Sequence, residues 1–277
     1  MTSRPESPVL QKQCDIEVTH CMTKRMITEC PEWVSALKER EFSGAQKSSE
    51  WLTQRSKMLT ASDAGAAIGE NKYQTQSDFI HTKCNESFGE KTYKGNANTE
   101  WGEAWEQTAL QKYCDRYHKD VYSFNLIQHK SIPWMGGSPD GITHDKILIE
   151  IKCPPQRKPV RGDASKIPVA YMHQVQMLLH ICELEICHFV QYVPYKGPFA
   201  DEYFDVIEIK LDPDWWSTKQ SILADTWAKI LSRRHLIETG DFLPELVEDT
   251  DDIKPKRQKN TPEPSKVQQM DFLITVV

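Results

Sequence analysis

Ser-Pro-Asp-Gly-Ile (138–142) and Ile-Leu-Ile-Glu-Ile-Lys-Cys-Pro-Pro (147–155) are the two neighbouring stretches that decide the fold. The second stretch is apolar and ends at a proline pair, which predicts a strand over residues 146–153. Because alternate side chains of a strand share a face, Glu150 and Lys152 project together, roughly 7 Å apart. Charges on such an apolar strand are costly, so we expect them to be paired or bound to a metal ion.

Asp140 supplies a second carboxylate, ten positions before Glu150. Residues 138–141 predict a turn, and a hairpin-like return through residues 143–145 would place Asp140 beside Glu150. Two adjacent carboxylates repel unless a hard cation bridges them, which predicts a Mg²⁺ site. Lys152 would then orient or deprotonate a water, or neutralise charge on a phosphate. The alternative is a structural ion pair of Glu150 with Lys152, with Asp140 as a turn former.

Composition bounds the class of protein. The chain has 277 residues, of which 39% are hydrophobic and 27% are charged, enough for one sizeable core or two small domains. A net charge of -6 excludes global attraction to nucleic acid, so any DNA binding needs a local basic surface. No apolar run is long enough to span a membrane. The polar start at residues 1–13 lacks a signal-peptide core, so we expect an intracellular, non-secreted protein whose eight cysteines are free thiols.

Periodicity predicts three regions: an irregular lead over 1–30, a folded domain over 31–242 and a flexible tail over 243–277. The tail joins an acidic run to the basic run Lys254–Lys259, which could be a nuclear import signal, a DNA contact or a solvating segment. Helices are expected around residues 33–37 and over 100–118, 169–181 and 215–237, and strands over 121–128, 186–193 and 204–211. Ser62 is expected to cap a helix starting near Asp63. This order of elements favours an α/β fold with a mixed sheet.

Five segments together resemble one known family. "SPDGI" (138–142) and "LIEIKCP" (148–154) are similar to the PD-(D/E)XK nuclease motif. "RSKMLTASDAGAAIG" (55–69), "WGEAWEQTA" (101–109) and "YMHQVQ" (171–176) resemble, in order, the further motifs of the YqaJ-type viral recombinase family, which includes the lambda-type exonuclease. The resemblance covers roughly residues 51–211 and implies a restriction-endonuclease-like core, a central mixed sheet flanked by helices.

The resemblance also implies roles for individual residues. Asp140, Glu150 and the backbone carbonyl of Ile151 would ligate Mg²⁺, with Mn²⁺ as a substitute, and Glu106 would ligate directly or through water. Lys152 would act on the nucleophilic water, and Gln174 would help to place the water or the phosphate. The residues implied for binding a DNA 5′-phosphate are Arg55, Ser62 and Ser138.

A basic segment follows the predicted catalytic strand directly. It contains Arg157, Lys158, Arg161 and Lys166. A solvated loop is the ordinary explanation of such a run. Its position beside the predicted metal site makes contact with the DNA backbone an equally good interpretation.

The resulting expectation is a Mg²⁺-dependent deoxyribonuclease, most simply a 5′→3′ exonuclease acting on double-stranded DNA ends in recombination or viral DNA processing. The resemblance further implies a homotrimeric ring and a single-strand annealing protein as partner. One alternative is an endo- or exonuclease of the alkaline-nuclease kind that also cuts RNA. Another is a non-catalytic DNA-binding module on the same fold.

Overall fold

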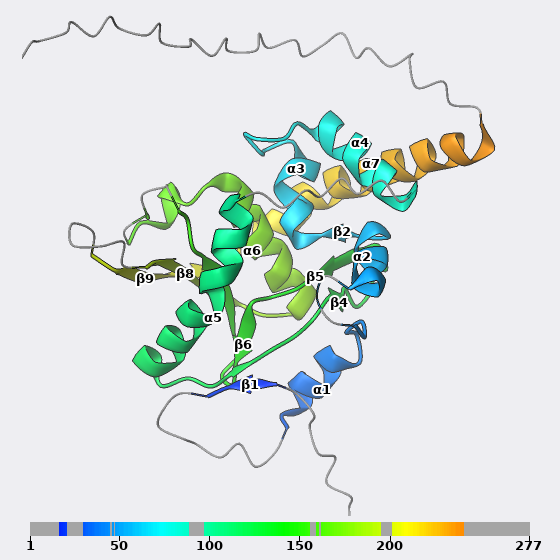
Figure 1. Cartoon of the computed structure of the whole chain (residues 1–277). Coiled ribbons are helices and arrows are strands. Elements are labelled where there is room, and N and C mark those ends of the chain that lie inside the picture. Colours follow the sequence, from blue (N-terminus) through cyan, green and yellow to red (C-terminus); the bar gives the residue numbers. More distant parts are fainter. Residues whose placement is uncertain are drawn as a thin grey trace, which may run out of the picture.

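The computed structural model describes residues 17–20, 30–44, 46, 48–88, 97–155, 159–160, 162–194 and 201–240. These residues form a mixed α/β fold in which helices cover both faces of a central sheet (Figure 1), so the predicted fold class is confirmed. The predicted tail over 243–277 lies outside the described residues.

The central sheet has six strands. Their order is β1 (Val18–Thr19), β3 (Val121–Tyr122), β6 (Gly141–Thr143), β7 (Ile147–Lys152), β8 (Ile186–Val193) and β9 (Tyr203–Lys210). β7 and β8 run parallel and the other neighbours run antiparallel. Parallel neighbours need a long crossover, which α6 (Val169–Cys182) supplies. The predicted strands 146–153, 186–193 and 204–211 are confirmed as β7, β8 and β9.

A smaller sheet has the order β2 (Leu59–Thr60), β5 (Met135–Gly137) and β4 (Ile127–Gln128). The prediction of one strand over 121–128 is therefore wrong, because its ends belong to different sheets. Apolar residues stand side by side at both ends of this segment, at 121–122 and at 126–127, so strict alternation fails and one sheet face cannot take them all.

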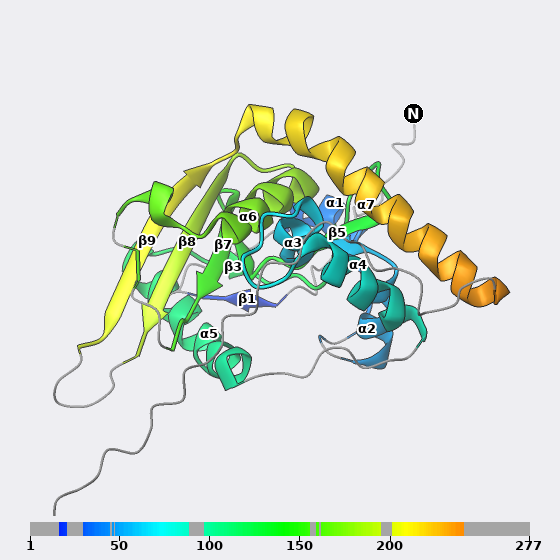
Figure 2. The same ribbon diagram turned by 90° about the horizontal axis from the view of Figure 1, so that it is seen from above.

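Helices form the outer layers of the molecule. In chain order the remaining helices are α1 (Glu32–Lys38), α2 (Ser49–Ser56), α3 (Ala64–Ile68), α4 (Gln76–Asn85), α5 (Ala97–Tyr117) and α7 (Pro213–Thr239). Leu110 and Tyr113 of α5 pack with Ile149 and Ile151 on one face of β7. Leu148, on the other face, belongs to the core that contains α6. Long α7 runs along α3 and α4 at one side of this assembly (Figure 2).

Two local expectations need correction. The segment 138–141, predicted as a turn, leads directly into β6, whereas the return predicted through residues 143–145 is present as a tight turn at 144–146, where Lys146 takes a φ of 64°. The Lys146 backbone N–H closes this turn by donating to the Thr143 carbonyl at 2.9 Å. The lead over 1–30 is not wholly irregular either, because Val18 pairs with Tyr122 to form β1.

Two further expectations concerned cysteines and membranes. Cys84, Cys114, Cys153, Cys182 and Cys187 are buried free thiols, as predicted. Cys30 is disulfide-bonded, so the prediction of a free thiol is wrong there. Within the described ranges no helix is both long enough and apolar enough to cross a membrane.

The close approach of α3 to α6 yields a stability prediction. A Cβ added at Gly65 would lie 2.7 Å from Cβ and 2.8 Å from Cα of Ala170. Because backbone cannot move aside cheaply, we expect Gly65→Ala to lower the free energy of unfolding by about 1–3 kcal/mol in urea denaturation. Gly102→Ala on α5 is the control: its Cβ meets nothing within 4 Å, so it should stabilise by about 0.5–1 kcal/mol. Equal effects of the two substitutions would contradict the prediction.

Candidate active site

The two predicted carboxylates meet across β6 and β7. Gly141 pairs with Ile149 in antiparallel register, which puts Asp140 opposite Glu150. The Asp140 Oδ2 atom accepts a hydrogen bond from the Ile151 backbone N–H at 2.6 Å. Glu150 is only 1% exposed. The structure thus joins the carboxylates as the spacing in the sequence predicted.

Lys152 and Gln174 both donate to one oxygen of Glu150. The Glu150 Oε1 atom lies 2.5 Å from Lys152 Nζ and 2.7 Å from Gln174 Nε2. Gln174 lies on α6, the crossover helix that connects the parallel strands β7 and β8. Tyr171, one turn earlier on α6, lies under the lysine, with Nζ 4.9 Å from its ring centroid. Sequence reasoning missed Tyr171; its only signal was a place three residues before Gln174, on the same helix face.

The arrangement leaves acceptor oxygens for a cation. The Glu150 Oε2 atom is buried and has no hydrogen-bond partner among the described residues, which is costly for a carboxylate oxygen. Within the described part of the chain, no three His, Cys, Asp or Glu side chains gather closely enough to hold a metal ion. Asp140, Glu150 and the Ile151 carbonyl nevertheless fit Mg²⁺, which takes oxygen ligands, often one or two carboxylates, and keeps several waters.

Burial and negative charge raise the pKa of Asp140 well above its ordinary value. Burial is the largest cause, and the charges of Glu150 and then Glu106 add to it, against Lys152 and the Ile151 N–H. Glu106 therefore lies near this cluster, as the resemblance implied. Burial, again with Glu106 and Asp140, raises the pKa of the Cys153 thiol to about 12.

The same negative charges also act on the pKa of Lys152. Burial alone would lower its pKa, but the negative charges of Glu150 and Asp140 and the hydrogen bond to Glu150 outweigh burial. The pKa of Lys152 consequently lies above its ordinary value, and its amine is held as an ammonium group.

A second polar cluster, the Arg55 group, consists of Arg55, Thr60 and Ser62. The Arg55 Nη2 atom donates to Thr60 Oγ1 at 3.2 Å and to Ser62 Oγ at 3.1 Å. The expectation that Ser62 caps a helix is wrong, because Thr60 and Asp63 form the capping box of the 3-10 turn η1 (Ala61–Asp63). The Ser62 hydroxyl is turned to Arg55 and Thr60 instead, as an anion-binding role would require.

Ser138 follows the strand beside this group. β2 and β5 pair in parallel, with Thr60 opposite Gly136, and a Cβ at Gly137 would lie 3.1 Å from the Ala61 Cβ. Ser62 and Ser138 are the next residues of these two adjacent segments. The buried Ser138 Oγ atom has no hydrogen-bond partner within the described residues. Two residues later the same segment reaches Asp140, so it connects the Arg55 group to the carboxylates.

The basic segment is described only in part. Arg157, Lys158 and Arg161 lie outside the described residues. Lys166, in η3 (Ala164–Lys166), forms an exposed ion pair with Asp163 at 3.1 Å. A DNA-backbone contact by these residues stays a prediction.

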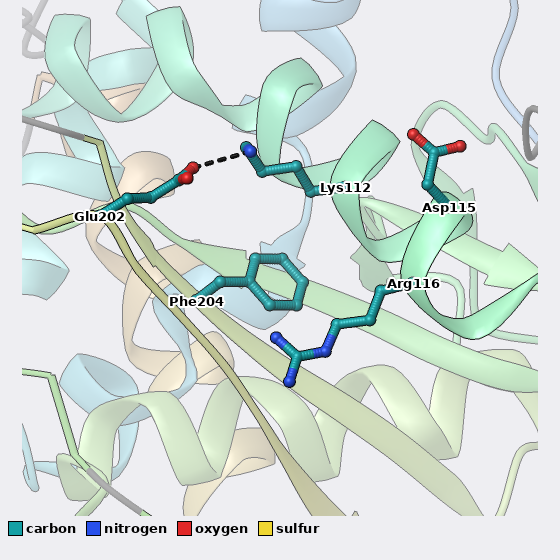
Figure 3. A pocket seen from close by; sticks show the side chains of 5 residues that line it. All are labelled: Lys112, Asp115, Arg116, Glu202 and Phe204. Carbon is teal, nitrogen blue, oxygen red and sulfur yellow. Dashed lines mark ion pairs between the residues drawn. The ribbon is translucent and has the colours of Figure 1, made fainter.

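A pocket of about 600 Å³ opens between α5 and β9 (Figure 3). It is lined by Lys112, Asp115, Arg116, Glu202 and Phe204. Lys112 pairs with Glu202 at 2.8 Å, and the Arg116 guanidinium lies 5.5 Å from the Phe204 ring centroid. No residue predicted for the site lines this pocket.

Solved structures share this fold. The crystal structure of LHK-Exo in complex with dAMP has a TM-score of 0.58 at 22% identity, covering 70% of this chain and 98% of that chain. The crystal structure of the alkaline exonuclease LHK-Exo from Laribacter hongkongensis gives 0.57 at 21% identity with the same coverage. The likeness defines an exonuclease-type α/β fold.

Sequence comparison then gives the family. Residues 50–185 match the YqaJ-like viral recombinase domain. These residues of the chain therefore carry a YqaJ-like viral recombinase domain. The uncharacterized protein R354 of Acanthamoeba polyphaga mimivirus is 30% identical over 160 residues, which are 53% of this chain and 29% of that protein. The match thus spans less than a third of this relative.

The crowded carboxylates predict a gain in stability when one charge is removed. With chelator present, Asp140→Asn keeps an acceptor for the Ile151 N–H, removes the charge, and should raise the unfolding midpoint at neutral pH. Because the pKa of Asp140 is higher in the folded than in the unfolded state, its protonated carboxyl group stabilises the folded wild-type protein at low pH. This contribution is lost as the pH rises through the folded-state pKa of Asp140. The difference from wild type should therefore shrink toward acid pH in thermal unfolding followed between about pH 4 and 8.

Asp145→Asn is the matched control. Asp145 lies in the β6–β7 turn and forms an ion pair with Lys119. Lys119 lowers the pKa of Asp145, even though burial, the largest influence, acts to raise it. Its substitution should leave stability unchanged or reduce it by up to about 1 kcal/mol. A destabilised Asp140→Asn protein would contradict the crowding described above.

Proposed function

We propose that this protein is a Mg²⁺-dependent deoxyribonuclease, a 5′→3′ exonuclease that acts on double-stranded DNA ends. One observation carries the proposal: Asp140 and Glu150 oppose each other across β6 and β7, with Lys152 2.5 Å from Glu150. The match of residues 50–185 to the YqaJ-like domain and the fold shared with an alkaline exonuclease support the same reaction class.

The metal would be held by Asp140, Glu150 and the Ile151 carbonyl, with Glu106 ligating directly or through water, and Mn²⁺ could replace Mg²⁺. Once bound, the cation would lower the pKa of a water and neutralise charge on the phosphate. Its charge would also relieve the repulsion between the carboxylates. The unpartnered Glu150 Oε2 atom is the observation that favours a cation at this position.

Lys152 and Gln174 would orient the reacting groups. An ammonium group donates hydrogen bonds and cannot accept a proton, so Lys152 in this state would hold a water or a phosphate oxygen. Gln174 holds Glu150 Oε1 through one N–H, which leaves the other N–H for a water or a phosphate oxygen. Tyr171 would keep the lysine stem in place from below.

The polarity of digestion would follow from the Arg55 group. Among the described residues Arg55 forms no ion pair; it donates to hydroxyls and lies 4.7 Å from the Trp51 ring centroid. A guanidinium that donates to the hydroxyls of Thr60 and Ser62, with Ser138 on the neighbouring segment, suits a phosphate with an extra charge, such as a 5′-terminal one. Binding of that terminus a short chain distance from Asp140 would favour cleavage from the 5′ end.

The remaining proposals follow from the family. A recombinase role would place the enzyme in DNA recombination or viral DNA processing, inside the cell and with the nucleus as one location. The single strand left by digestion would pass to an annealing protein, and a homotrimer would enclose the duplex. Sedimentation with and without duplex DNA tests the trimer directly.

Removal of the lysine charge tests catalysis. Lys152→Ala should lower cleavage of end-labelled linear duplex by about 10²-fold or more with Mg²⁺ present, because the reacting water and phosphate lose their cationic donor. Duplex binding, measured by fluorescence anisotropy, should persist. Unchanged cleavage would overturn this role, and a wild-type protein that binds but never cleaves would support the non-catalytic alternative.

Substrate form tests the direction and the class of nuclease. Wild type should degrade linear duplex and spare a covalently closed circle and RNA; cleavage of either would favour the alkaline-nuclease alternative. Arg55→Ala should reduce kcat/KM on 5′-phosphorylated ends by about tenfold or more, since it removes a charged hydrogen bond, with little change on 5′-hydroxyl ends. Equal rates of wild type on both ends would contradict the phosphate assignment.

A further inference from the structure

Lys83 is an unusually buried charge at the edge of the Arg55 group. It lies near the end of α4, is only 3% exposed, and has Asp63 and Glu86 each 3.2 Å from its ammonium nitrogen. A buried lysine is costly unless it is paired. Nothing in the local sequence predicted this pairing, since Asp63 lies in a different element, η1.

Asp63 connects Lys83 to the residues that contact Arg55. Its Oδ2 atom accepts from the Thr60 backbone N–H at 2.9 Å and from the Thr60 hydroxyl at 2.8 Å. With its proton donated to Asp63, the Thr60 oxygen can only accept, and it accepts from Arg55 Nη2 at 3.2 Å. Asp63 therefore sets the orientation of the hydroxyl that holds the guanidinium.

Charge balance gives Lys83 a second effect. Burial would raise the pKa of Asp63, but the charges of Lys83 and then Arg55, with the Thr60 hydrogen bonds, outweigh burial and keep its pKa low. Without Lys83, the Asp63 carboxylate would have Arg55 as its nearest compensating charge. A guanidinium turned to Asp63 would be partly neutralised and drawn away from Ser62.

Helix α7 holds this assembly from behind. Arg234, 8% exposed, donates to the Ser56 carbonyl at 2.8 Å and to the Lys83 carbonyl at 2.6 Å. Ser56 is the neighbour of Arg55, at the end of α2. The ends of α2 and α4, the helices that carry Arg55 and Lys83, are thus both hydrogen-bonded to the Arg234 guanidinium. This shared contact fixes the position of one helix end relative to the other.

We propose that Lys83 is a positioning residue for terminal-phosphate recognition: by pairing with Asp63, it leaves Arg55 free to bind the phosphate. The proposal rests on the function proposed above. Lys83 itself contacts neither DNA nor metal in this scheme. It acts on the selectivity between 5′-phosphorylated and 5′-hydroxyl ends and leaves the cleavage step to Asp140, Glu150 and Lys152.

The test compares kcat and KM on matched 5′-phosphorylated and 5′-hydroxyl duplexes, using full-length Lys83→Met. The 5′-phosphate preference should fall about tenfold, the size expected for loss of one charged hydrogen bond. The rate on 5′-hydroxyl ends should stay within about twofold of wild type, which a general loss of folding would not allow. Lys38→Met, which removes a lysine paired with Glu41 at 2.6 Å on α1, is the matched control and should keep the preference.

A double variant, Lys83→Met with Asp63→Asn, separates charge from packing. The asparagine oxygen can still accept from Thr60, and position 63 no longer carries a negative charge that attracts Arg55, so the preference should return at least in part. A Lys83→Met protein that keeps full preference, or a double variant as unselective as the single one, would overturn the proposal. If wild type lacks the preference, or Arg55→Ala retains it, the phosphate assignment itself fails.

Discussion

The hydrogen bond from the Ile151 N–H to Asp140 is the contact on which the site depends. It ties the residue before β6 to the residue after Glu150, so the two carboxylates cannot separate to relieve their repulsion. This backbone donor stabilises a charged acceptor inside a buried cluster, where an unpaired carboxylate would be most costly. Burial, and then the negative charge of Glu150, raise the pKa of Asp140, and a bound divalent cation would offset that charge. In the function proposed above, this cost in stability would be offset when the two carboxylates bind a metal ion.

The two polar groups share one structural solution. Around Glu150, Lys152 and Gln174 bond to one oxygen, and the other is buried without a hydrogen-bond partner among the described residues. Around Arg55, Lys83 neutralises Asp63 and leaves the guanidinium with hydroxyl partners only. In both places, neighbouring side chains occupy one polar group and leave another able to bind a ligand. These are the Glu150 Oε2 atom in the first cluster and the Arg55 guanidinium in the second. The segment from Gly137 to Asp140 joins the two groups.

Sequence reasoning succeeded where the signal was local. The alternation and proline stop of β7, and the periodicity of α5, α6 and α7, predicted those elements, and the Asp140–Glu150 spacing predicted their meeting. It failed where contacts between distant segments decide: residues 121–128 divide between two sheets, and Thr60 rather than Ser62 is the cap. Lys83 gave no signal and Tyr171 only its spacing from Gln174, because the role of a buried lysine, or of a tyrosine beneath a lysine, is defined by its partners in space.

The position of β8 has a consequence for where the protein can be cut. The family match ends at residue 185, just before β8, and excludes β9 and α7. A fragment trimmed to 50–185 would turn β7 into a bare sheet edge, exposing backbone groups and the apolar side chains that pack on Phe189. It would also leave the Ser56 and Lys83 carbonyls without Arg234. The conserved-domain boundary in sequence is therefore no boundary for autonomous folding, and such a fragment is expected to aggregate.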